Sequence, residues 1–190
     1  AALAKAIREH NAFNAILRKI GEYRCGDKPV MTGTQYHRIV VAASASPKKA
    51  LLPILKKIRD DLPKRDPLPA YRSRLLLVGG HLDDPGYISI IESQGGLVVG
   101  DRLCTGSYPG LQPIPETGDP IAALAKHYLT KTSCPRMMEA FRERAEDIVT
   151  LARDCRADGV VIQILKFCDT WGVEAAAFVS YIQEAGIPVL

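Results

Sequence analysis

RLLLVGGHLDDPGYISIIESQGGLVVGDRLCTG, residues 74–106, contains two short apolar runs on either side of a helix-like stretch. The run Arg74 to Gly79 is apolar without alternation, as expected for a strand that is buried on both faces. Asp83, Asp84 and Pro85 open a helix that Gly95 and Gly96 close, and Leu97 to Gly100 forms the second strand. This order of elements predicts a parallel pair with a right-handed crossover.

The same alternation continues toward the carboxyl end. A charged helix is expected over Pro135–Ala157, a third strand over Gly159–Leu165, a helix over Thr170–Ala185 and a fourth strand over Ile187–Leu190. We therefore predict an α/β fold, in which a Rossmann-like or flavodoxin-like parallel sheet is flanked by helices and preceded by a helical segment. We expect strands one and three to be neighbours and strand two to flank strand one, which gives the order 2-1-3-4.

The first third of the chain has helical rather than strand periodicity. We expect a helical segment over residues 1–67 and an α/β domain over residues 71–190, joined by the proline-rich linker LPKRDPLPAYR. Helix begins at the first residue without a start signal, and the last residues read as a strand that has just begun. We therefore expect further protein on each side, so that the α/β domain is truncated at its C-terminal end.

Composition excludes several classes of protein. Of the 190 residues, 47% are hydrophobic, which argues against disorder, and the net charge of +4 is mild. The apolar runs are too short to cross a bilayer, no signal peptide is expected, and basic and aromatic residues do not interleave. We expect a cytoplasmic protein that binds neither membranes nor nucleic acid.

The five cysteines are the residues most suggestive of chemistry. Without a signal peptide a disulfide framework is not expected, and no CxxC pair occurs. Ligands of open parallel sheets bind outside the carboxyl ends of the strands, where Cys104 and Cys168 follow predicted strands in polar loops that contain glycine. Thiolates there suit an iron–sulfur cluster or zinc, although a single cysteine is more often a small buried hydrophobe.

The other cysteines and histidines carry weaker signals. Cys134 precedes Pro135 at a helix start, where a thiolate is favoured, and it stays ambiguous between the two interpretations. Cys155 reads as core, and Cys25 reads as incidental to a helix end. His81 follows the Gly79-Gly80 turn, which has no dinucleotide-binding fingerprint, and is expected to hydrogen-bond locally.

Three stretches resemble the iron–sulfur subunits of the 2-hydroxyacyl-CoA dehydratase and benzoyl-CoA reductase family. The first is the quoted segment 74–106. The second is ADGVVIQILKFCDTWGVEAAAFVSYIQEAGIPVL, residues 157–190, in which KFCDTWG is fairly specific, and the weaker third is DPIAALAKHYLTKTSCPRM, residues 119–137. The resemblance covers most of the chain from Arg74 to Leu190, and the helical part more loosely.

The resemblance implies one [4Fe-4S] cluster per subunit, held mostly by three cysteines. Two of these match Cys104 and Cys168, and Cys134 stands where some relatives carry a further cysteine. The first ligand of the family belongs to an N-terminal α/β domain outside this chain. Because two thiolates rarely hold a cluster, this piece of protein alone could lack one.

The resemblance further implies a mechanism and partners. An ATP-dependent activator protein injects one electron, which passes through the cluster to the thioester carbonyl of an acyl-CoA, and the resulting ketyl radical expels the 2-hydroxyl group. A related second dehydratase subunit completes the enzyme. The alternatives are a benzoyl-CoA reductase-like or double-cubane reductase subunit, an electron-transfer or scaffold subunit without its own substrate site, and a plain α/β binding domain with structural cysteines.

Overall fold

The computed structural model describes residues 1–105, 111–131, 134 and 136–190, and its helices and strands alternate along the C-terminal two thirds of the chain. The helices are α1 (Ala2–Cys25), α2 (Gly33–Ala45), α3 (Lys48–Asp61), α4 (Gly86–Ser93), α5 (Pro120–Leu129), α6 (Phe141–Asp154) and α7 (Asp169–Glu184). The strands are β1 (Ser73–Gly79), β2 (Gly96–Arg102) and β3 (Gly159–Gln163). Short 3-10 turns occur at Leu62–Lys64 and Met138–Ala140.

The sheet is parallel throughout, with the order β2-β1-β3. Beyond β3 the predicted fourth strand is present only as a single parallel bridge between Val160 and Val189. Its hydrogen bonds run from the Val160 amide to the Pro188 carbonyl, 2.8 Å, and from the Leu190 amide to the Val160 carbonyl, 2.9 Å. The α/β fold class is therefore confirmed, and the C-terminal segment lies on the side of β3 that the order 2-1-3-4 requires.

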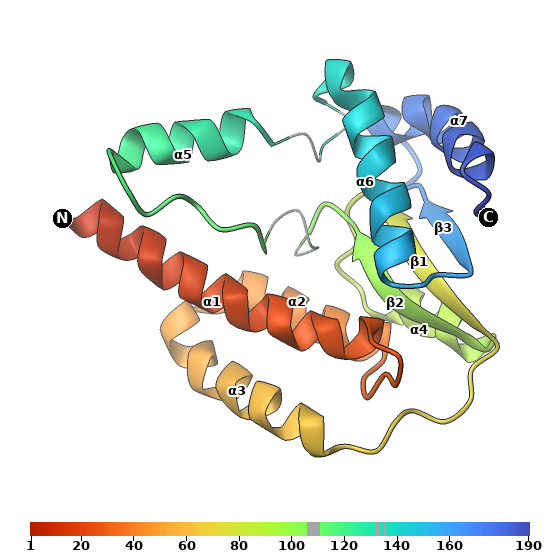
Figure 1. Cartoon of the computed structure of the whole chain (residues 1–190), viewed down its shortest axis with the longest axis horizontal. Coiled ribbons are helices and arrows are strands. Elements are labelled where there is room, and N and C mark those ends of the chain that lie inside the picture. Colours follow the sequence, from red (N-terminus) through yellow and green to blue (C-terminus); the bar gives the residue numbers. More distant parts are fainter. Residues whose placement is uncertain (106–110, 132–133, 135) are drawn as a thin grey trace.

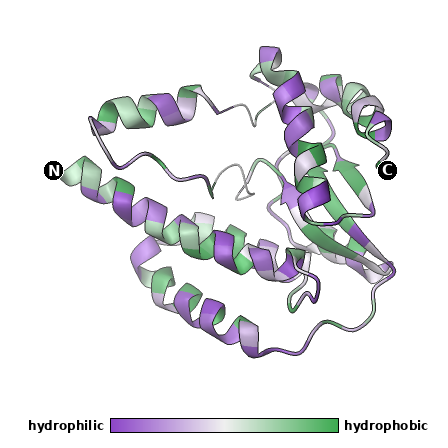
Figure 2. Cartoon of the chain, in the orientation of Figure 1, coloured by the Kyte–Doolittle hydropathy of each residue, from purple (hydrophilic) through white to green (hydrophobic). Residues whose placement is uncertain are grey.

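Helices cover both faces of this sheet, because side chains alternate along each strand. Leu76, Val78 and Val160 pack against α6 and α7, whereas Leu77 and Val98 pack against α4 on the other face. Figure 1 shows α6 lying across the strands, and Figure 2 shows that the strands themselves are largely hydrophobic. No helix in the described ranges is both long enough and apolar enough to cross a membrane.

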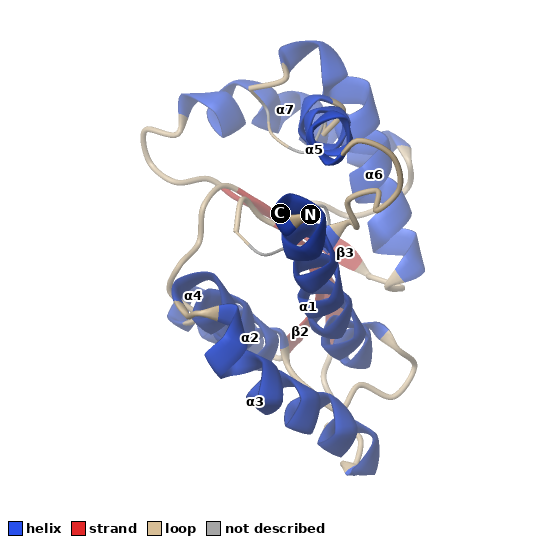
Figure 3. Ribbon diagram, turned by 90° about the vertical axis from the view of Figure 1, so that its left-hand side faces the viewer, coloured by secondary structure: helices blue, strands red, loops and turns tan. Residues whose placement is uncertain are grey.

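The first three helices build an apolar cluster of their own beside the sheet. Helix α1 lies between the group α2–α4 and the group α5–α7 (Figure 3) and contacts the edge strand β2. There Arg24 makes a buried ion pair with Asp101 and stacks over the Tyr36 ring, with its guanidinium carbon 4.0 Å from the ring centroid. The expected division at residues 67–71 remains a prediction.

Several predicted boundaries are wrong. The third strand ends at Gln163 instead of Leu165, and the charged helix ends at Asp154 instead of Ala157. The second strand continues to Arg102 instead of ending at Gly100, because Asp101 and Arg102 are buried as ion-pair partners, the latter with Asp147 at 3.0 Å. The helix expected from Pro135 begins at Phe141, and Pro135 itself lies outside the described residues. The Met137 carbonyl accepts bonds from the Ala140 amide, 2.9 Å, and the Arg144 side chain, 2.6 Å, which closes a 3-10 turn before the helix.

Gly79 ends the central strand where no larger residue fits. Its φ is 152°, and a Cβ placed on it would lie 1.9 Å from the carbonyl oxygen of Gln163 in β3. The close approach of these two strand ends holds the loops after β1 and β3 side by side. The sequence-based interpretation of a tight turn at Gly79-Gly80 agrees with this geometry.

Replacing Gly79 with alanine should therefore push β1 and β3 apart. We expect Gly79→Ala to lower the free energy of unfolding by about 3 kcal/mol, as overpacking and backbone strain of this kind do. Gly172→Ala in α7 is the matched control, because nothing lies within 4 Å of its added Cβ and alanine favours helix by about 1 kcal/mol. Urea unfolding of both variants measures the difference, and equal stabilities would contradict the assignment.

Candidate functional site

Gly80 is the point at which the loops after all three strands meet. The Cys104 amide, beyond β2, donates to the Gly80 carbonyl at 3.3 Å, and the Gly80 amide lies 3.4 Å from the Gln163 carbonyl of β3. A Cβ placed on Gly80 would lie 3.8 Å from Sγ of Cys168 and 3.6 Å from the Trp171 ring. The structure thus places Cys104 and Cys168 next to the same residue, Gly80, at the carboxyl edge of the sheet.

Cys168 occupies the N-cap position of α7, and its surroundings favour the thiolate. The backbone N–H of Trp171 and the hydroxyl of Thr170, 3.6 Å from Sγ, lower the pKa of this thiol. Arg136 lowers it further, whereas desolvation and Asp169 act in the opposite direction. A helix N-terminus stabilises an anion in the same sense.

Cys104 has a different environment but the same neighbours. Desolvation raises the pKa of its thiol, the Trp171 side chain opposes this rise, and negative charge on Cys134 or Cys168 would raise the pKa further. Cys134 and Cys168 are therefore both close enough to Cys104 to influence its thiol electrostatically. Cys104 is exposed, and the other two are partly exposed, so the group is accessible from outside the sheet.

Trp171 adds a buried donor between these thiols. Its side chain is 2% exposed, and its indole N–H interacts with the Cys104 thiol, whose pKa it lowers. The donor is therefore directed at the thiol group, where it stabilises negative charge on a sulfur atom. The sequence signal was the tryptophan of KFCDTWG, which the prediction of site residues left out, and Arg136 near Cys134 was missed as well.

These residues fit the cluster that the family resemblance implies. Among the described residues, no three side chains of His, Cys, Asp or Glu converge closely enough to hold a single metal ion. The ligands of a cubane cluster lie farther apart, because each thiolate binds a different iron. With metal–thiolate bonds near 2.3 Å, the thiolate sulfurs lie roughly 6 to 7 Å apart. Soft thiolates suit the irons of such a group, and the buried N–H of Trp171 suits a sulfur atom.

The other residues that the sequence singled out, His81, Cys155 and Cys25, have structural roles. The Thr105 hydroxyl lies 2.6 Å from Nδ1 of His81, and this hydrogen bond joins the loops after β1 and β2. The prediction that His81 hydrogen-bonds locally is confirmed. Cys155 is buried against Leu97 and Val99 on the face covered by α6, so its assignment to the core is confirmed. Cys25 packs against the same cluster and is far from Gly80 in the fold.

Comparison with known proteins identifies related sequences. The family model described as 2-hydroxyglutaryl-CoA dehydratase, D-component, matches residues 1–190. The chain is 23% identical over 186 residues to the (R)-phenyllactyl-CoA dehydratase beta subunit of Clostridium sporogenes, covering 98% of this chain and 50% of that protein. It is 33% identical over 123 residues to the putative dehydratase subunit YjiM of Escherichia coli (strain K12), covering 63% of this chain and 31% of that protein.

The chain thus spans half the length, or less, of these curated relatives. The match to the family model nevertheless extends over every residue of the chain, including the helical part. The resemblance found at the cysteine loops is thereby confirmed, and this chain belongs to the 2-hydroxyglutaryl-CoA dehydratase D-component family.

Proposed function

We propose that this chain forms part of the iron–sulfur subunit of a 2-hydroxyacyl-CoA dehydratase. The observation that carries the proposal is the placement of Cys104 and Cys168 next to Gly80, with Cys134 near Cys104 and the buried indole N–H of Trp171 beside them. The relatives of this chain are named as dehydratase subunits, and the name of one of them gives an acyl-CoA as substrate. These names support the removal of water from a 2-hydroxyacyl-CoA as the reaction.

In this proposal Cys104 and Cys168 hold a [4Fe-4S] cluster, and Cys134 is an additional ligand. A bound cluster would supply the single electron that an ATP-dependent activator delivers and that the acyl thioester needs before it loses its hydroxyl group. The chain's own contribution is to lower the pKa of the Cys168 thiol, through the N-terminus of α7 and the Thr170 hydroxyl. Because Gly80 has no side chain, the three loops can approach one another closely at this residue.

Partner proteins would approach along the loop that follows β3. Phe167 is 87% exposed with a positive φ of 72°, and Val173 on the first turns of α7 is also exposed. Lys166 lies over the Phe167 ring, 5.2 Å from its centroid. An exposed aromatic ring beside a redox centre is a suitable contact for the second dehydratase subunit or for the activator, because burial of such a ring stabilises an interface.

The function is tested with the full-length protein together with its second subunit and an activator. Anaerobic turnover with a panel of 2-hydroxyacyl-CoA thioesters should give the corresponding unsaturated acyl-CoA. Ring reduction of an aromatic acyl-CoA without dehydration would favour the reductase alternative. A complex that accepts electrons but turns over none of the thioesters would favour an electron-transfer subunit.

The ligand assignment makes a separate prediction. Cys168→Ser in the full-length protein should lower iron from about four atoms per cluster to less than one and abolish turnover, because a thiolate ligand is removed. Cys25→Ser is the matched control, since its thiol lies in another part of the fold. Iron and sulfide analysis, with circular dichroism to check folding, makes the measurement. Full iron content in Cys168→Ser would refute the site.

Trp171 should tune the cluster rather than hold it. Hydrogen bonds to cluster sulfurs stabilise the more negative reduced state, so Trp171→Phe should lower the reduction potential by tens of millivolts while iron content stays full. Phe178→Leu, in the same apolar cluster but without a donor, is the control for packing. Redox titration followed by EPR gives the potentials, and equal shifts in both variants would remove the donor role.

A further inference from the structure

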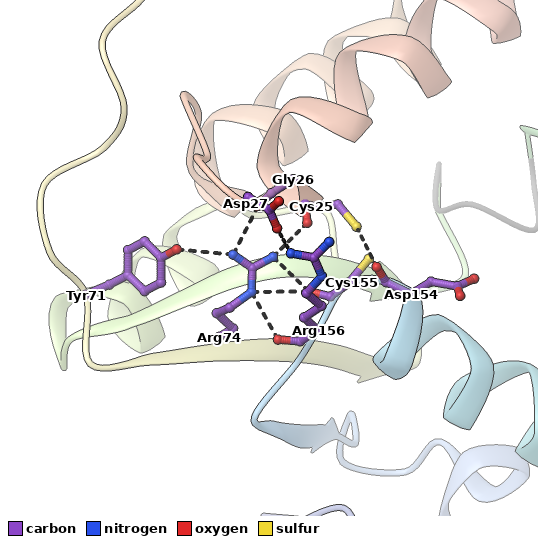
Figure 4. A network of polar contacts seen from close by, with 8 residues as sticks. All are labelled: Cys25, Gly26, Asp27, Tyr71, Arg74, Asp154, Cys155 and Arg156. Atoms are coloured by element: carbon purple, nitrogen blue, oxygen red, sulfur yellow. Dashed lines mark hydrogen bonds and ion pairs between the residues drawn. The ribbon is translucent and has the colours of Figure 1, made fainter.

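Two thiols that are 130 residues apart in sequence meet at the opposite side of the fold from Gly80. Cys25 is the last residue of α1, and Cys155 caps the C-terminal end of α6 (Figure 4). The Cys25 side chain packs on the apolar cluster that contains Cys155, and its Sγ lies 3.7 Å from the Asp154 carbonyl oxygen. Both cysteines also line one cavity of about 410 Å³ between α1 and the sheet.

Arg74 fixes the two backbones side by side. Its Nη2 donates to the carbonyl of Cys25 at 2.7 Å and to the carbonyl of Cys155 at 2.8 Å. Its Nη1 donates to the Gly26 carbonyl and to the Tyr71 hydroxyl, so the guanidinium group is held from several directions. One side chain of β1 therefore bridges the end of α1 and the end of α6 at the two cysteines themselves (Figure 4).

An ion pair strengthens the same junction. Arg156, the residue after Cys155, pairs with Asp27, two residues after Cys25. Arg74 also donates to the Arg156 carbonyl at 3.0 Å. Contacts thus surround the thiol pair on both segments, and such pre-positioning is what a disulfide requires, because its Cα atoms must lie within about 7 Å.

The two thiols differ in reactivity in a way that suits an exchange reaction. The hydrogen bond with the Cys155 thiol lowers the pKa of Cys25 to about 7, against the effect of burial and with the help of Arg24 and Arg74. The same hydrogen bond and burial raise the pKa of Cys155. Cys25 is partly exposed whereas Cys155 is buried, so Cys25 is the thiol that a reagent in solution can reach.

We propose that Cys25 and Cys155 form a reversible disulfide that joins helix α1 to the α/β sheet. The oxidant is a small disulfide such as oxidised glutathione. The Cys25 thiolate attacks one of its sulfurs and releases the first thiolate. Cys155 then loses its proton and attacks the Cys25 sulfur, which releases the second, so that two protein thiols and one disulfide become one protein disulfide and two thiols.

The bond would act on the junction that holds α1 against the edge strand. Arg24, next to Cys25, makes the buried ion pair with Asp101 of β2, and Asp101 lies three residues before Cys104. Closing the disulfide attaches this end of α1 covalently and lowers the conformational entropy of the unfolded chain. The oxidation state of the pair would therefore set how firmly the helical part is attached to the sheet.

The test uses the full-length protein and needs no variant for its main measurement. The apoprotein is incubated anaerobically with oxidised glutathione at pH 7.5, the remaining thiols are alkylated, and tryptic peptides are analysed by mass spectrometry. We expect residues 25–38 linked to residues 154–156, each of which contains one cysteine, in most of the molecules. The thermal midpoint should rise by several degrees, and dithiothreitol should reverse the rise.

Cys25→Ser and Cys168→Ser serve as controls. Cys25→Ser should leave Cys155 free for alkylation and show no rise in thermal midpoint, whereas Cys168→Ser should form the 25–155 bond as the wild type does. That second result separates the inference from the proposed cluster site. Glutathione retained on Cys25 with Cys155 still free, or no linked peptide at all, would overturn the proposal.

Discussion

The paired backbone of β1 is the constraint on which the rest of this structure depends. Because β1 hydrogen-bonds to β2 on one side and β3 on the other, the loops that follow all three strands leave the sheet at one edge. The chain passes from β1 to β2 on one side and then to β3 on the other side, so β1 is the topological switch point of the sheet. Ligands of doubly wound folds bind at such a point. Gly79 keeps the β1 and β3 ends close enough for that edge to be narrow.

Much of this arrangement could be predicted from the sequence. Continuous apolar runs marked the strands, glycines and the Asp-Asp-Pro segment marked helix ends, and the alternation of strands and helices indicated a parallel sheet. The placement of Cys104 and Cys168 at one edge followed from the order alone. Local patterns failed where tertiary contacts decide: Asp101 and Arg102 read as loop because their ion-pair partners, Arg24 and Asp147, are distant in sequence.

The five cysteines divide into two groups with different physical characters. Around Gly80 the thiols are exposed or partly exposed and lie next to the buried N–H donor of Trp171, which is typical of a site for a bound group. At the amino end of β3 the other two are held by Arg74 and pack against the core, which favours reaction with each other. Sequence alone assigned Cys25 to no role, since its partner is brought to it only by the fold.

The claim that Cys104 and Cys168 share one site can be measured directly in the full-length protein. A short bifunctional thiol alkylator, such as dibromobimane, is applied to the anaerobic apoprotein and again after reconstitution with iron and sulfide. The account predicts a cross-link between peptide 103–126 and the peptide that begins at Phe167 in the apoprotein, and its loss after reconstitution. Absence of that cross-link in the folded apoprotein, or its persistence at full iron content, would contradict the account.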